Sequence, residues 1–577
     1  MEKIDLRGCF PVMNGGDGVI LSKRGDVCYG WEVELPPAFR CNEERYDAIV
    51  QALFSAVTLL PDYTVVHKQD VYMKKKYVAE KSDGLLQEAY ERHFDGREYL
   101  DHRCRLFLIF SSKKNVRGAS SGLLGISAGG SMPKAEVLAR YAAMAEQFAT
   151  VVQGCGLLEM RCLTEDDIFG VGDFPGLIQD YLNFTDEGED VLSDIQMRRD
   201  RVRTGDRYIG CHLIADLDQL PAEVASCRKV TSLSTDSSAV NLSFLNEIGQ
   251  ELDCEHIVNH FILKEPQKDI HGELDTRRRQ MLSMSARSAE NRTYSEELNE
   301  FLEEAATEQM HTVRFHINVL AGGTADEFES VKDKVVSAVS RMGVTPVYDI
   351  YDTPCQFWAS IPGNEAGLAY QEYMTADLKV ALCMGIYDGF EPGVPDGVMK
   401  MSDRLRLVPQ RFDIQEKALE MGLIENYNVF LLGPSGSGKS FFMNKYLKSC
   451  YDAGQHVFLI DVGDSYRALC NIIKEESKGL DGTYYTFEKG KPISFNPFRN
   501  VERFRTADNQ ALNFLFTLMM TLWKNGNETM NSASMKIVRD SIIGFVDRWA
   551  DKCDPVFNDY YRYVRDEFCL SLGEKEI

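Results

Sequence analysis

The residues whose types and spacing could do chemistry form one short segment, GPSGSGKS. This segment fits the pattern G-x-x-x-x-G-K-[ST]. Glycines allow the backbone to turn tightly and to bring its N–H groups around phosphate oxygens. The N-terminus of a following helix adds partial positive charge that attracts the same anion. The pattern predicts a phosphate-binding loop made of Gly433, Pro434, Ser435, Gly436, Ser437, Gly438, Lys439 and Ser440.

The last two residues of this loop have distinct expected roles. Lys439 would reach the β- and γ-phosphates of a nucleotide, and the Ser440 hydroxyl would bind Mg²⁺. Lys439 is therefore the expected catalytic residue, and ATP and Mg²⁺ are the expected cofactors. A Gly/Ser loop that contains a lysine by chance is the alternative. The flanking pattern argues against it, because residues 428–432 (NVFLL) predict a short buried strand and residues 441–454 predict a helix.

An acidic residue that would activate the attacking water is harder to find. The apolar run at residues 456–461 ends in Asp461, but Val462 follows it where hydrolysing motors carry a glutamate. The pair Asp566 and Glu567 has no apolar strand before it. We therefore predict that the Walker B carboxylates are not among residues 1–577, and hydrolysis by this chain alone stays an open question.

Residues 1–180 predict a mixed α+β domain. The pattern indicates a β-hairpin at residues 18–35, helices at 43–59 and 134–153, strands at 63–73, 104–110 and 157–162, and a Gly/Ser-rich mobile loop at 111–131. Acidic and basic blocks at residues 181–206 predict a solvated linker.

Residues 207–400 predict a second α+β domain. Strand patterns cover residues 208–217, 256–264 and 311–321, and a long helical stretch at 273–309 joins the last two. That order predicts a crossover unit on a sheet. His256 and His260 are spaced as metal ligands on a helix would be, but the surrounding run favours one face of a strand.

The C-terminal part, residues 401–577, predicts a P-loop domain with a helical insert from about residue 506. Residues 507–523 and 532–550 place apolar side chains at helical spacing. Only two strands of a nucleotide-binding sheet are visible, so we expect a partial domain.

Length, composition and charge exclude several classes of protein for this chain. The chain has 577 residues, of which 44% are hydrophobic and 26% charged, which is typical of folded, multidomain protein. Its net charge is −24, and nearly all of this lies in residues 1–400, which disfavours a protein that coats duplex nucleic acid. The 15 cysteines are scattered, the N-terminus has no apolar signal segment, and the longest apolar run, at 514–523, is too short to span a bilayer. We expect a cytoplasmic protein.

Six segments in order resemble the TraG-type conjugation ATPases of conjugative transposons. They are DGVILSKRGDVCYGWEVELP, LPDYTVVHKQD, WASIPGNE, VFLLGPSGSGKSFFMN, FLIDVGDSY and ISFNPF. The chain is also similar to the wider class of ATPases that energise type IV secretion. The resemblance runs over nearly the whole sequence.

The resemblance implies N-terminal domains that dock on channel proteins at the inner membrane and a C-terminal RecA-like motor. It further implies a hexamer that hydrolyses ATP to drive transfer, with residues 433–440 as the phosphate loop. Two alternatives stay open beside this motor: a nucleotide-binding scaffold of the same apparatus that does not hydrolyse ATP, and a P-loop motor that translocates DNA directly.

Overall fold

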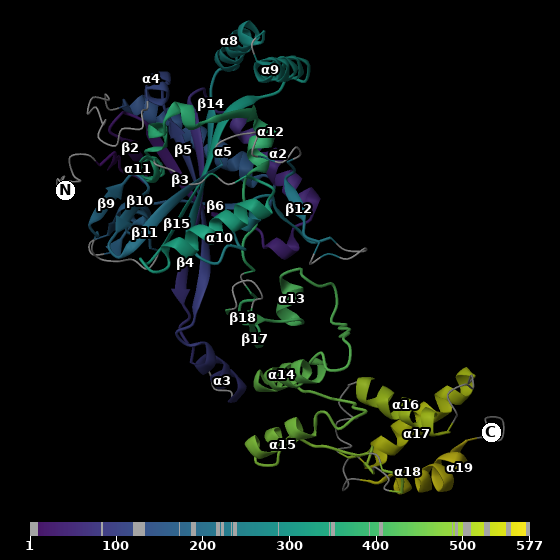
Figure 1. Cartoon of the computed structure of the whole chain (residues 1–577). Coiled ribbons are helices and arrows are strands. Elements are labelled where there is room, and N and C mark those ends of the chain that lie inside the picture. Colours follow the sequence, from purple (N-terminus) through teal and green to yellow (C-terminus); the bar gives the residue numbers. More distant parts are fainter. Residues whose placement is uncertain are drawn as a thin grey trace. The chain divides into compact units, whose positions relative to one another are not determined.

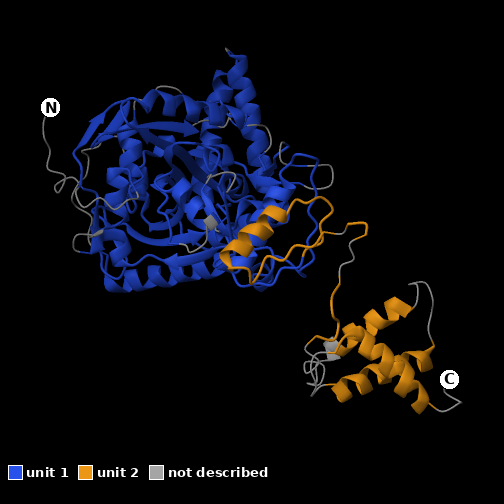
Figure 2. Cartoon of the chain, turned by 90° about the horizontal axis from the view of Figure 1, so that it is seen from below, with its two compact units in different colours: residues 1–458 blue, residues 459–577 orange. Residues whose placement is uncertain are grey.

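The computed structural model forms two compact units, residues 1–458 and residues 459–577, which Figure 2 shows in separate colours. Each unit is described by itself. The structure describes residues 10–572 apart from 82–84, 119–132, 172–173, 186–191, 215–219, 221–223, 232–233, 235–238, 287, 346, 348–351, 392, 403–407, 487, 491–493, 500–508, 524–530 and 550–554.

The first unit is built on one large antiparallel sheet (Figure 1). Its main path runs β1-β2-β3-β5-β4-β14-β15-β11-β10-β9, while β6 pairs with β3 and β16 pairs with β15. The strand bounds are β1 Val12–Asn14, β2 Ile20–Ser22, β3 Val27–Glu34, β4 Thr64–Lys76, β5 Glu98–Phe110, β6 Glu159–Cys162, β9 Ile195–Arg198, β10 Arg201–Thr204, β11 Arg207–Ile214, β14 Glu255–Lys264, β15 Thr312–Gly323 and β16 Met374–Asp377.

Helices cover both faces of this sheet, because alternate strand residues point to opposite sides. Along β4, Val66 and Tyr72 join one core, and Val65 and Val71 join the other. The first core packs against α2 (Glu43–Thr58), α5 (Ala135–Gln153), α10 (Phe328–Arg341) and α12 (Leu378–Cys383). The second core packs against α6 (Glu165–Phe169), α7 (Leu177–Asn183) and α11 (Thr353–Ala359).

The expected linker at residues 181–206 is not a boundary. Residues 195–204 form β9 and β10, and strands from both sides of this stretch lie in the same sheet. Val202 of β10 is fully buried, whereas Arg201 and Arg203 are only partly covered. The arginines that suggested a solvated linker therefore belong to a strand with one buried face.

The expected crossover between residues 256–264 and 311–321 is also wrong. Both strands form, but β14 and β15 are antiparallel neighbours, with Asn259 opposite Asn318. The helical stretch between them is two packed helices, α8 (Gln267–Met284) and α9 (Ala289–Thr307). The break falls at Ser288, whose side chain accepts a hydrogen bond from the N–H of Asn291 and begins α9.

The other strands and helices expected before residue 180 all form. Part of the expected loop at 111–131 is a short helix, α4 (Lys113–Arg117), and residues 119–131 lie outside the described residues. The segment WASIPGNE lies against the sheet. There Glu365 hydrogen-bonds His67 of β4 (Oε1 to Nδ1, 2.9 Å), and the Gln69 amide donates to the Ser360 carbonyl.

The long regular elements that the structure describes in residues 459–577 are helices, with turns and irregular segments between them. Helix α15 spans Arg467–Glu476, and α16 (Asn509–Trp523) and α17 (Ser532–Trp549) match the two helices that the apolar spacing predicts. They pack with α18 (Phe557–Tyr563) around Phe498, Phe545 and Tyr560. Of the helices that the structure describes, none is long and apolar enough to cross a membrane.

Candidate functional site: the loop at residues 433–440

The predicted loop lies directly before helix α14 (Lys439–Asp452), as the sequence pattern requires. Gly436 and Gly438 have φ values of 82° and 90°, in the left-handed region that favours glycine. Gly433 lies close to a neighbouring side chain, since a Cβ there would lie 2.5 Å from the Ser437 Oγ. The three glycines therefore allow a loop that closes tightly on itself.

Lys439 and Ser440 are the first two residues of α14. The Lys439 ammonium donates hydrogen bonds to the carbonyls of Gly433 (2.6 Å) and Pro434 (2.9 Å), so its side chain spans the loop. Ser440 is exposed, and its carbonyl accepts a hydrogen bond from the Asn444 amide. Lys439 and Ser440, the two side chains expected to be functional, are neighbours in the sequence, but the pattern carries no sign of the backbone carbonyls that hold Lys439.

Helix α14 packs against a small β-hairpin. Strands β17 (Met399–Ser402) and β18 (Pro409–Phe412) pair, and Met399 is fully buried against Tyr446 and Cys450 of α14. The helix therefore has a fixed base, while the loop at its N-terminus is open to solvent.

The residues present fit a nucleotide phosphate with Mg²⁺. The first turn of a helix leaves backbone N–H groups without partners inside the helix, and here the loop in front of them is exposed. A lysine ammonium and a serine hydroxyl stand in the same turn, which are the donor and the oxygen ligand that such a group needs.

The two strands expected beside the loop do not form. Residues 428–432 and 456–461 have no ladder partner among the described strands, and their apolar side chains are exposed, with Phe430 87% and Phe458 90% exposed. A strand needs a hydrogen-bonded neighbour to satisfy its backbone, so an apolar run alone does not produce one.

The acidic residues considered for water activation are engaged elsewhere. The Asp461 carboxylate accepts a hydrogen bond from the N–H of Ser465 (2.7 Å). Asp566 and Glu567 lie in a helical segment and pair with Arg565 and Arg548, respectively.

His256 and His260 lie on strand β14 and are both buried. Burial lowers the pKa of His256 to about 4 and that of His260 to about 3, so both imidazoles are neutral. Tyr72 stacks on His256 at 4.4 Å between ring centres. These contacts are those of core side chains in a strand.

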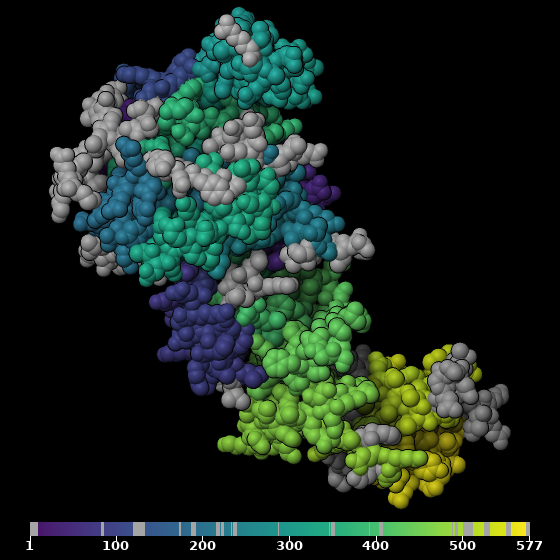
Figure 3. All heavy atoms as spheres, viewed as in Figure 1, coloured from purple at the N-terminus to yellow at the C-terminus, as the bar shows by residue number. Residues whose placement is uncertain are grey.

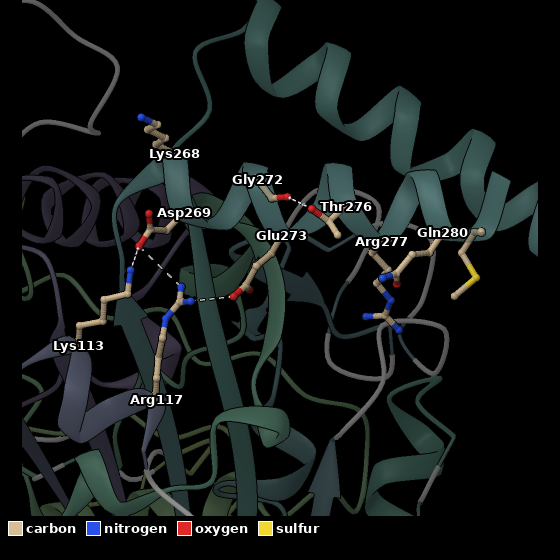
Figure 4. A pocket seen from close by; sticks show the side chains of 10 residues that line it. Lys113, Arg117, Lys268, Asp269, Gly272, Glu273, Thr276, Arg277 and Gln280 are labelled. Carbon is tan, nitrogen blue, oxygen red and sulfur yellow. Dashed lines mark hydrogen bonds and ion pairs between the residues drawn. The ribbon is translucent and has the colours of Figure 1, made fainter. Parts of the chain in front are cut away.

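A separate hollow of about 530 Å³ lies on α4 and α8 (Figure 4). Four of its charged side chains neutralise one another: Lys113 pairs with Asp269 (2.5 Å), and Arg117 pairs with Glu273 (2.8 Å). Arg117 also pairs with Glu265. Lys113 and Arg117 are therefore held by carboxylates, in contrast to Lys439, which is held by neutral carbonyls.

Two comparisons with known proteins bear on this site. Residues 398–577 match the family model of the TraG P-loop domain. The chain is also similar to protein TraC of Escherichia coli (strain K12), with 33% identity over 76 residues. That match covers 13% of this chain and only 8% of TraC. Residues 398–577 are therefore similar to the TraG P-loop domain, and both matches support the resemblance to TraG-type conjugation ATPases.

Proposed function

We propose that the chain binds ATP with Mg²⁺ at residues 433–440 and acts as an ATP-driven motor of conjugative transfer. The observation that carries the proposal is the placement of Lys439 and Ser440 in the first turn of α14, after a loop in which Gly436 and Gly438 have positive φ. The match to the TraG P-loop domain supports conjugative transfer as the process that the proposed motor would drive.

Each part of the loop has a role in this proposal. The carbonyls of Gly433 and Pro434 keep the Lys439 ammonium over the loop, where the β- and γ-phosphates would accept its hydrogen bonds. The Ser440 hydroxyl would bind Mg²⁺, which supplies charge neutralisation at the phosphates when bound. The backbone N–H groups from Gly436 to Ser440 would complete the anion cradle.

The wider expectations belong to the same proposal. The chain would act in the cytoplasm, dock through its N-terminal unit on channel proteins at the inner membrane, and work as a hexamer. The apolar segments at 428–432 and 456–461 would be strands of a RecA-like sheet once they have pairing partners.

A nucleotide-binding scaffold is the second candidate. It is favoured by the contacts of the acidic residues, because Asp461 is bound to a backbone N–H and Asp566 and Glu567 are held in ion pairs. Such a chain would bind ATP at the same loop without turning it over.

ATP binding by Lys439→Ala tests the proposal. The substitution removes one charge-assisted contact, worth roughly 1.5–3 kcal/mol, so we expect at least a tenfold loss of affinity in calorimetry with Mg²⁺. Lys417→Ala is the matched control, since that lysine lies on α13 (Glu416–Glu420), away from the loop, and pairs with the exposed Glu420.

Unchanged ATP affinity in Lys439→Ala would contradict the site. Phosphate release, measured on the same samples, separates the two candidates: turnover by the wild-type chain supports the motor, and tight binding without turnover supports the scaffold.

A further inference from the structure

Strands β4 and β5 continue beyond the sheet into an arm that ends in helix α3 (Leu85–Phe94). We call the described residues 77–81 and 85–97 the arm tip. The pairing of the two strands extends into it, because the N–H of Tyr77 donates to the Arg97 carbonyl (2.8 Å) and the N–H of Gly96 donates to the Tyr77 carbonyl (2.9 Å). Figure 1 shows α3 at the far end of these two long strands.

The arm tip holds Lys400 of β17. The Lys400 ammonium pairs with the carboxylates of Glu91 and Glu80, and it donates to the Tyr77 hydroxyl at 3.1 Å. Glu91 is 4% exposed and Lys400 is 7% exposed, so this ion pair is buried. Removing either partner would leave a charge buried without its counterion, which is costly.

The charges of this contact are held in place by their partners. Burial opposes the charge on Lys400, but its hydrogen bonds to Glu91, Glu80 and Tyr77 outweigh that effect, and its pKa is raised. Burial likewise opposes the charge on Glu91, yet the bond from Lys400 lowers the pKa of that carboxyl. Both groups are therefore ionised near neutral pH.

A second contact joins the same place to helix α14. The Lys445 ammonium of α14 donates to the Lys400 carbonyl and lies 3.7 Å from the centre of the Tyr90 ring in the arm tip. In Figure 3 the indigo atoms of the arm lie beside the green atoms of the segment that holds β17 and α14. Lys445 lies six residues after Lys439, about 9 Å along the helix.

We propose that the arm tip is a positioning element for the phosphate loop: Glu91 and Tyr90 fix β17 and α14, and so set the helix that carries Lys439 and Ser440. The inference rests on the proposed ATP site at residues 433–440. In this proposal the residues of the arm tip do not contact the nucleotide. They act through Lys400 and Lys445 on the orientation of α14.

Linkage gives this proposal a measurable consequence. If arm docking favours the ATP-binding orientation of α14, then ATP must favour arm docking by the same factor. Contacts that couple two sites in this way typically change affinity by about two- to thirtyfold. We expect the loss of the Glu91 contact to weaken ATP binding by about three- to tenfold.

The variants Glu91→Gln, Lys400→Met and Lys445→Met, made in the full chain, test the proposal by ATP affinity. Each variant should weaken ATP binding. Glu91→Gln combined with Lys400→Met should bind ATP no more weakly than the more severe of the two single variants, because both substitutions remove the same Glu91–Lys400 contact. Lys75→Ala is the matched control: this lysine pairs with Asp101 on the stem of the arm, and its loss should leave ATP affinity unchanged.

A second measurement does not depend on how the variants fold. At an ATP concentration near the wild-type Kd, ATP with Mg²⁺ should slow amide hydrogen exchange in the arm tip of the wild-type chain, and it should slow it much less in Lys439→Ala. Wild-type affinity in both Glu91→Gln and Lys400→Met, or arm exchange that ignores ATP, would overturn the inference. Such a result would leave the proposed ATP site standing if Lys439→Ala still binds ATP more weakly than the wild-type chain. The ATP site itself would be contradicted if the wild-type chain bound no ATP.

Discussion

Replacing Gly433 by alanine tests the loop geometry by steric contact alone. The added Cβ would lie 2.5 Å from the Ser437 Oγ and 3.3 Å from the Lys439 Cγ. Gly433 does not have a positive φ, so alanine is allowed there by the backbone itself. The cost must therefore come from the two neighbouring side chains, one of which is the lysine expected to hold the phosphates.

The size of the effect follows from these distances. A contact of 2.5 Å forces the exposed Ser437 hydroxyl to rotate away, and holding a side chain off its preferred rotamer costs about 0.5–1.5 kcal/mol. Because the same Cβ crowds Lys439, we expect ATP affinity to fall by about tenfold, which corresponds to about 1.4 kcal/mol. Calorimetric titration with ATP and Mg²⁺ measures it directly.

A second substitution separates crowding from other causes. Ser437→Ala removes the closest atom and leaves the Ser437 Cβ position 3.4 Å away, an ordinary contact, so Gly433→Ala with Ser437→Ala should recover most of the affinity. Gly438→Ala should not be rescued in this way, because its φ of 90° penalises alanine although no atom lies within 4 Å. The steric argument is refuted if Gly433→Ala binds as wild type does, or if Ser437→Ala restores nothing.

Two further outcomes concern the first unit. Burial, with a smaller contribution from Lys332, lowers the pKa of His212 to about 4. Between about pH 6.5 and pH 4 this histidine is therefore protonated in the unfolded chain and neutral in the folded chain. This residue's contribution to stability therefore falls as pH drops below about 6.5, and His212→Gln should make the loss of unfolding free energy between pH 7.5 and 5.5 smaller by about 1 kcal/mol. An unchanged pH slope in urea titrations would contradict this. Phe430→Ser should change the unfolding free energy by no more than about 0.5 kcal/mol, because Phe430 is 87% exposed. Phe107→Ala, in the core, should cost about 3–5 kcal/mol, and a similar cost at Phe430 would mean that residues 428–432 are buried as the sequence predicts.

The central strands could be predicted from sequence because they are buried on both faces. Residues 104–110 are a nearly continuous apolar run, and residues 256–264 are rich in Ile, Val, Phe and Leu; both lie inside the sheet, in β5 and β14. Strand β10 was missed for the opposite reason. Its alternation of Arg201, Val202, Arg203 and Thr204 has the period of a strand, but the arginines suggested a solvated segment.

The pairing of strands could not be predicted in the same way. The length of residues 273–309 suggested a crossover helix and hence parallel strands, but a helical hairpin spans the same number of residues and returns the chain beside its start. Only the serine cap at Ser288 signals the break between α8 and α9, and a single serine within a helical pattern is weak evidence.

The phosphate loop and the arm contact differ in how far their constraints reach along the chain. Gly433 is constrained by Ser437 and Lys439, which lie within six residues, so one motif contains the whole requirement. Glu91 and Lys400 are 309 residues apart, and each is of a residue type that is usually found at the protein surface. Charged side chains are almost never buried alone, so their burial has meaning only as a pair. A sequence motif can therefore show which residues would meet a nucleotide, whereas the element that positions them becomes visible only when the fold brings two ordinary charges together.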